Sequence, residues 1–166
     1  LFLVFKQLSY AQDFTIKNSG NYFEIHEILS QYIQQKSISG NEKAAGEWLK
    51  NLCEQNDLFI TPMGDKDGNY NFSASVRPLK EGLPNIIFLN HIDVVPVGDS
   101  SKWNYPPFSG MIMDGKVWGR GAFDNKGAAM VQLASVIQSV RNYKNNKIPF
   151  NITFLAVSCE ETQCEG

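Results

Sequence analysis

The segment 85–96 constrains the fold of this chain more than any other part of the sequence. It reads NIIFLNHIDVVP, so an apolar run of strand length ends in His91 and Asp93 before Pro96 prevents the ladder from continuing. Buried strands of this kind belong to parallel sheets with helices on both faces. The chemistry of such sheets lies just beyond the carboxyl ends of the strands, so we expect His91 and Asp93 to stand at a site.

A second strand reaches the same edge through a helical crossover. Apolar residues recur at helical spacing over 125–140, and the run FNITFLAV at 150–157 predicts another buried strand that leads into Glu160 and Glu161. A strand–helix–strand unit of this length is right-handed and makes its two strands parallel. Asp124, just before the helix, then starts from the same edge. We therefore expect an α/β fold, a three-layer sandwich with a mostly parallel central sheet.

Shorter elements are predicted around this unit. Apolar residues at helical spacing indicate an amphipathic helix over 21–35. Ser39 followed three residues later by Glu42 fits a capping box, which predicts that a second helix begins there and ends at about Asn56. The remaining strand predictions are 58–62, 70–76 and a hairpin of 111–113 with 116–118 around the turn at 114–115.

The composition is that of a globular protein and gives no sign of a nucleic-acid or membrane partner. Hydrophobic residues make up 43% of the 166 residues and charged residues 19%, which is ordinary for a chain that buries a core. The formal net charge of -2 provides no electrostatic attraction for nucleic acid. No apolar run approaches the roughly 20 residues that a bilayer crossing needs, so we expect no membrane span.

Both ends of the sequence suggest part of a longer, exported protein. The apolar LFLVF at 1–5 and the small residues of SYA at 9–11 are typical of the tail of a signal peptide, although a piece of amphipathic helix would read similarly. We expect residues 1–11 to be that tail, and the protein to be periplasmic or secreted. The sequence stops at Gly166 directly after an acidic cluster, which indicates that residues 12–166 are a fragment.

The three cysteines are too few for a disulfide framework. Cys53 lies on a predicted helix face, and Cys159 and Cys164 lack the close spacing of a zinc knuckle, so buried or free thiols are the simplest interpretation. A bridge between Cys159 and Cys164 stays open if the protein is exported.

The predicted edge of the sheet gathers one histidine and four carboxylates. Crowded carboxylates raise each other's pKa unless positive charge compensates them. Two divalent cations would supply that charge, and imidazole with carboxylate suits zinc, cobalt or manganese. Asp124, between a glycine-rich turn and a helix start, is a candidate to bridge two ions. Each polar pair alone could be an ordinary strand end, but the arrival of three segments at one edge favours a site.

Several motifs occur in an order that resembles a known family. They are HIDVVP at 91–96, WNYPPFSG at 103–110, WGRGAFDNKG at 118–127 and the pair at 160–161. Together they look like the co-catalytic zinc peptidases: aminoacylase, carboxypeptidase S, carboxypeptidase G, acetylornithine deacetylase and succinyl-diaminopimelate desuccinylase. The resemblance extends from about Ile25 to the last residue, and PPFSG leans towards the carboxypeptidase S and aminoacylase branch.

The resemblance implies a role for each matched residue. His91 would bind one metal, Glu161 would bind the other and Asp124 would bridge both, with two Zn²⁺, or Co²⁺ or Mn²⁺, as cofactors. Glu160 would be the general base and later the acid that protonates the leaving amine. Asp93 would orient the ring of His91 by accepting its other N–H. A cis peptide bond after Asp124 is also implied.

The function implied is a metal-dependent hydrolase that cleaves an amide bond in a small peptide or an N-acyl amino acid through a hydroxide bridged by two metals. Two alternatives stay open: a non-catalytic peptidase-like binding module, and a biosynthetic deacylase of the acetylornithine deacetylase type. Retention of Glu160, which folding does not need, argues against the first. Export would disfavour the second.

The family has parts for which this sequence has no counterpart. Two further metal ligands and a smaller lid domain, which helps to bind the substrate's carboxylate and often dimerises, would follow Gly166. We therefore expect the N-terminal part of a metallopeptidase catalytic domain, incomplete at its C-terminal side, with any homodimer formed through the lid. Residues 12–166 alone should be inactive, bind metal weakly and expose apolar surface where neighbours are missing.

Overall fold

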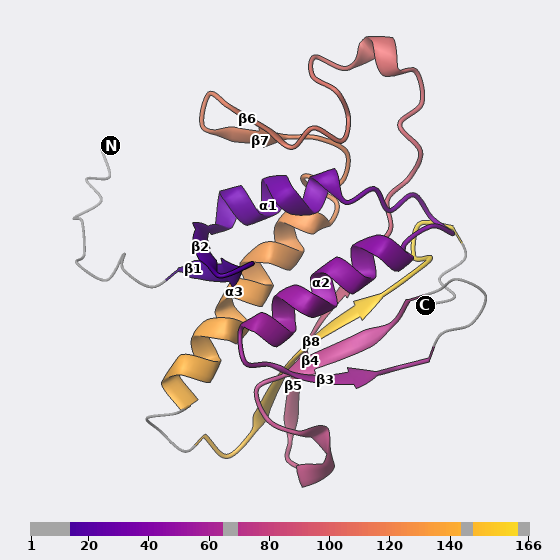
Figure 1. Ribbon diagram of the computed structural model, residues 1–166. Helices are drawn as coiled ribbons and strands as arrows, with labels where there is room; N and C mark the ends of the chain where they lie inside the picture. The colour runs from indigo at the N-terminus through magenta and orange to yellow at the C-terminus, as the bar shows by residue number, and fades with distance from the viewer. Residues whose placement is uncertain (1–13, 65–69, 144–147, 163–166) are drawn as a thin grey trace, which may run out of the picture.

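The structure is a computed structural model that describes residues 14–64, 70–143 and 148–162 (Figure 1). Its elements in chain order are β1 (Thr15–Asn18), β2 (Asn21–Glu24), α1 (Ile25–Gln34), α2 (Lys43–Gln55), β3 (Phe59–Pro62), β4 (Phe72–Ser75), η1 (Leu79–Glu81), β5 (Asn85–His91), η2 (Ser100–Lys102), β6 (Met111–Met113), β7 (Lys116–Trp118), α3 (Lys126–Tyr143) and β8 (Asn151–Val157). The predicted signal-peptide tail at 1–11 and Cys164 lie outside the described residues. None of the described helices is both long and apolar enough to cross a bilayer.

The principal sheet contains four strands in the order β3-β4-β8-β5. The predicted crossover is confirmed, because α3 connects β5 to β8 and these strands pair in parallel, with Asn85 opposite Asn151 and His91 opposite Val157. The other two pairings, β3 with β4 and β4 with β8, are antiparallel. The α/β class is therefore confirmed, but the described strands form a mixed rather than a mostly parallel sheet. The short connection from β3 to β4 explains part of this difference, since parallel neighbours need a long crossover.

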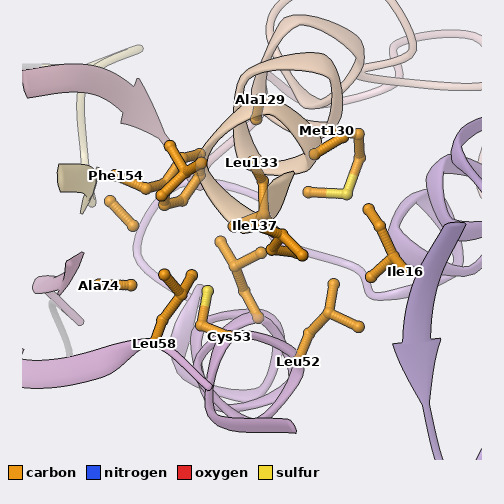
Figure 2. Packing of buried hydrophobic residues seen from close by; sticks show 14 of the residues in the cluster. Ile16, Leu52, Cys53, Leu58, Ala74, Ala129, Met130, Leu133, Ile137 and Phe154 are labelled. Carbon is orange, nitrogen blue, oxygen red and sulfur yellow. The ribbon is translucent and has the colours of Figure 1, made fainter. Parts of the chain in front are cut away.

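Helices α2 and α3 pack on one face of this sheet and α1 packs against α3, so the three described α-helices share one core. The register places Phe72 opposite Ala156 and Ala74 opposite Phe154, so these buried side chains share that face. Figure 2 shows Phe154 beside Leu133 of α3, with Ala74 of β4 and Cys53 of α2 in the same cluster. Cys53 is a buried thiol, as expected. Within the described residues the fold thus has helices on one sheet face rather than on both.

Strand β5 is less buried than its apolar sequence predicts. Ile87 is 54% exposed and Leu89 is 62% exposed, and only Asn90 and His91 at its end are buried. The reason is that β8 is its sole strand neighbour among the described strands and no described helix covers this face. The expectation of a fully buried strand is wrong here, and the expectation of exposed apolar surface is confirmed.

The N-terminal predictions need two corrections. Residues 21–24 are not helical but form β2, which pairs antiparallel with β1. Helix α1 begins at Ile25, because Glu24 and Glu27 form a capping box that satisfies the first amides. The capping box predicted at Ser39 is absent, and the Ser39 hydroxyl bonds to Asp93 instead. The β6–β7 hairpin, by contrast, is confirmed at the predicted residues.

Two glycines, one just before and one just after the β6–β7 hairpin, hold the hairpin against α1. At Gly110 a Cβ atom would collide with the carbonyl oxygen of Ser30, and the Ser30 hydroxyl donates to the Gly110 carbonyl at 2.6 Å. At Gly119 a Cβ atom would lie 2.5 Å from the Ile33 side chain and 2.9 Å from the Pro107 carbonyl oxygen. Helix α1 therefore packs directly against main chain at both points. These contacts fix where the chain enters the hairpin and where it leaves the hairpin towards Asp124.

A buried lysine fastens the end of α1 to the start of α3. The Lys126 Nζ donates to the carbonyl oxygens of Tyr32 at 3.1 Å and Gln35 at 2.7 Å, and it lies 4.5 Å from the Tyr32 ring centroid. Carbonyls at a helix C-terminus have no partner within the helix and carry partial negative charge, so an ammonium group suits them. Because Lys126 is the first residue of α3, the contact also fixes the position of Asp124.

Replacing Lys126 with methionine should destabilise the protein. Methionine keeps most of the volume, but the Gln35 carbonyl loses its side-chain donor and the Tyr32 carbonyl keeps only the Gln35 amide, so the free energy of unfolding should fall by about 1–3 kcal/mol. Urea unfolding of the full-length protein measures this value. Lys43→Met, at an exposed position in α2, is the control and should change stability by less than about 0.5 kcal/mol. Equal effects of the two substitutions would contradict the assigned role.

Candidate metal centre

The parallel pairing of β5 and β8 brings the predicted site residues to one edge of the sheet. The His91 Nε2 lies 3.1 Å from the Asp124 Oδ1 and 3.9 Å from the Glu160 Oε2. One ligand atom from each of His91, Asp124 and Glu161 lies within 4.8 Å of the other two. The Asp93 Oδ1 lies 3.5 Å from the other ring nitrogen of His91, Nδ1. All five predicted residues are therefore close together, although they come from three segments of the chain.

The ring of His91 is held so that one nitrogen faces the acidic cluster. Its Nδ1 lies 3.0 Å from the main-chain oxygen of Asp93 and 3.5 Å from the Asp93 Oδ1, so the shorter contact is to the main chain rather than to the carboxylate. A proton on Nδ1 leaves the Nε2 lone pair free to bind a metal. The Asp93 carboxylate, with a further contribution from Asp124, raises the pKa of His91 to about 9 despite burial.

Asp93 has a wider role than the sequence predicts. Its carboxylate is fully buried and accepts from the Ser39 hydroxyl at 2.7 Å and from the amides of Glu160 at 3.1 Å and Glu161 at 3.0 Å. Burial opposes ionisation, but the hydrogen bonds from His91, Ser39 and the two amides outweigh it and lower the pKa of Asp93 to about 2. Asp93 therefore orients the histidine and also holds the turn that carries both glutamates. No local sequence pattern indicates those amide contacts.

The outer side of the cluster is open and acidic. The Asp124 side chain is 72% exposed and that of Glu160 is 50% exposed. Burial raises the pKa of Glu161, and the carboxylates of Asp124, Asp93 and Glu160 add to this effect. One imidazole with several carboxylates is a donor set that suits zinc, cobalt or manganese, and a cation would relieve the repulsion. The peptide bond between Asp124 and Asn125 is cis, as expected.

The comparisons with known sequences agree with this geometry. Residues 87–166 match the peptidase family M20/M25/M40, and the chain belongs to that family. It is 34% identical over 139 residues to a succinyl-diaminopimelate desuccinylase of Orientia tsutsugamushi (strain Ikeda), an alignment that covers 82% of this chain and 34% of that protein. It is 33% identical over 126 residues to the desuccinylase of Ehrlichia canis (strain Jake), covering 76% and 33%. The chain thus spans about a third of the length of these relatives.

Solved structures show the same fold. An M20 family metallo-carboxypeptidase from Sulfolobus solfataricus, Sso-CP2, aligns with a TM-score of 0.70 and 26% identity over 84% of this chain and 31% of that one. Human carnosine dipeptidase 1 aligns with a TM-score of 0.66 and 19% identity, over 85% and 33%. A dinuclear metal binding M20 peptidase of Bacillus subtilis, YXEP, aligns with a TM-score of 0.52 and 18% identity, over 82% of this chain and 36% of that one. The last two likenesses support the fold alone.

Metal affinity should depend on pH through His91. Because the pKa of His91 is raised to about 9, a cation that binds Nε2 below this pH must displace a proton. The apparent affinity of the full-length protein for cobalt should therefore fall between pH 9 and pH 7, by up to about tenfold per pH unit. Absorbance titrations at pH 7, 8 and 9 measure this slope. His91→Gln should bind more weakly and lose the slope, whereas the exposed control His26→Gln should keep it; a slope unchanged in His91→Gln would contradict the assignment.

Proposed function

We propose that the full-length protein is a two-metal hydrolase that cleaves an amide bond in a small peptide or an N-acyl amino acid. The observation that carries the proposal is the convergence of His91, Asp124 and Glu161, with Glu160 beside them, in a chain of the M20/M25/M40 family. Retention of the additional acid Glu160 favours an enzyme over a binding module.

The arrangement gives each side chain a task in such a reaction. His91, Asp124 and Glu161 would hold the cations, which when bound would polarise the amide carbonyl and lower the pKa of a water. The Glu160 side chain is half exposed, so solvent and a substrate can reach its carboxylate. It accepts the proton of the attacking water as the new C–O bond forms and delivers it to the amine nitrogen as the C–N bond breaks.

Replacing Glu160 with alanine should nearly abolish hydrolysis without removing the metals. Loss of the proton acceptor should lower kcat by about 10²–10⁴-fold, because proton transfer contributes this much in such sites. The test is hydrolysis of N-acyl amino acids by the full-length protein with zinc or cobalt, together with metal content. Glu54→Ala, at an exposed position in α2, is the matched control. Equal rates for wild type and Glu160→Ala would exclude the mechanism.

A second candidate is favoured by the sequence relatives: a biosynthetic deacylase that is selective for one acyl group. The relatives described above are desuccinylases, whereas the structural neighbour at 26% identity is a carboxypeptidase. Both activities cleave an amide next to a free carboxylate, so they share the site and differ in what lies on the acyl side. The described residues include no lid that would select between them.

A substrate panel separates the two candidates. For an amidohydrolase of broad acyl specificity, we expect measurable kcat/KM on both N-blocked dipeptides and N-acetyl amino acids, within about tenfold of each other. A preference of about 100-fold or more for N-succinyl amino acids would assign the protein to the deacylases instead. The same substrates with their free carboxylate converted to an amide serve as the control for recognition of that carboxylate. The binding-module alternative would be favoured if a protein loaded with two metals hydrolysed none of these compounds.

A further inference from the structure

Three consecutive amides at the start of the glutamate turn bind to two buried carboxylates. The amides of Glu160 and Glu161 donate to Asp93, as described above. The amide before them, that of Cys159, donates to the Oε1 of Glu42 at 3.2 Å. Glu42 and Asp93 are both fully buried. The turn 159–161 thus has its main chain fixed by side chains from two other segments.

Glu42 is an unusual residue to bury at this point. Its Oε1 also accepts from the Gly40 amide at 2.9 Å and lies 3.5 Å from the Cys159 Sγ. Its Oε2 is buried and has no hydrogen-bond partner among the described residues. Burying a carboxylate in this way is costly. The start of α2 beside it lowers that cost through the helix dipole, but an exposed acid would receive the same benefit.

The segment that contains Glu42 is itself fastened to the end of β5. The Ser37 hydroxyl donates to the Ile92 carbonyl at 2.8 Å, and the Ser39 amide donates to the Val94 carbonyl at 3.2 Å. The Val94 amide returns a bond to the Ser37 carbonyl at 2.9 Å. Residues 37–42 therefore connect the strand end that carries His91 to the turn that follows β8.

The turn needs such support because of its backbone conformation. Cys159 has a φ angle of +58°, in the left-handed region that residues with a side chain rarely adopt. Conformations of this kind persist when the surrounding structure holds them in place. The bond from the Cys159 amide to Glu42 holds the residue at which the chain changes direction, and the next two residues are Glu160 and Glu161.

We infer that Glu42 is a positioning residue that sets the turn 159–161 and so aims Glu160 at the reacting water and Glu161 at the metal. This inference rests on the proposed function. Glu42 acts through the main chain and touches neither substrate nor metal. Its removal should therefore lower kcat more than it changes KM, because a misplacement of about 1 Å at a reacting group can cost about 100-fold.

The experiment compares Glu42→Ala, Glu42→Gln and the control Glu47→Ala, an exposed residue in the same helix, in the full-length protein. Glu42→Ala should lower kcat by about tenfold or more with KM within about twofold. Glu42→Gln keeps an acceptor oxygen but loses the charge that strengthens the bond, so its kcat should fall between wild type and alanine. Glu47→Ala should match wild type in both constants.

Amide hydrogen exchange supplies a readout that does not need activity. Exchange over 155–162 should speed up in Glu42→Ala but not in Glu47→Ala, while the core of α3 is unchanged. If wild type hydrolyses no substrate, the proposed function fails and this measurement still tests the contact. The inference would be overturned if Glu42→Ala kept the wild-type kcat and the wild-type exchange rates over 155–162. It would also be overturned if exchange in Glu42→Ala became faster throughout the domain while kcat stayed unchanged. If the alanine variant does not fold, wild-type values of both readouts in Glu42→Gln would overturn it.

Discussion

The parallel register of β5 and β8 is the constraint on which the rest of the site depends. Seven residue pairs align the two strands, from Asn85 with Asn151 to His91 with Val157, so both strands end at the same level. The chain leaving β5 and the chain leaving β8 therefore emerge side by side, and α3 begins close by. A shift of the register by one residue would turn every side chain to the other face and separate the histidine from the glutamates.

Within this frame, one buried charge joins the two halves of the site. Asp93 stays ionised although it is fully buried, because its oxygens receive hydrogen bonds from Ser39 and from the amides of Glu160 and Glu161 while His91 faces it. The bonds cross from one strand end to the other, so the histidine and the glutamates are placed relative to a common group. Such a carboxylate explains how an exposed acidic cluster keeps a defined geometry on connecting segments that are otherwise loops.

Much of this architecture could be predicted from the sequence, and the failures have physical causes. The crossover and the hairpin follow from long apolar periodicity and from the turn at Asp114, and the meeting of the site residues follows from the crossover. The sequence does not predict β1 and β2, because four-residue segments of mixed polarity show no period. The exposure of β5 depends on what packs against it, which its own sequence does not contain. The sequence predicts only a local capping role for Glu42, because its bond to Cys159 joins residues 117 positions apart.

The two glycines that flank the β6–β7 hairpin have a consequence for how this fold diversifies. Gly110 and Gly119 touch α1 so closely that a larger residue at either point would push the helix away from the loop. The segment between Pro96 and Gly110, in contrast, extends away from the body of the fold and includes only the short η2 (Figure 1). Changes of length and composition in the part of this segment before Pro106 leave both anchor points intact, because the contact at Gly119 involves Pro107. The architecture therefore separates a rigid frame from a replaceable outer segment, which is a favourable arrangement for exchanging segments between relatives without disturbing the acidic cluster.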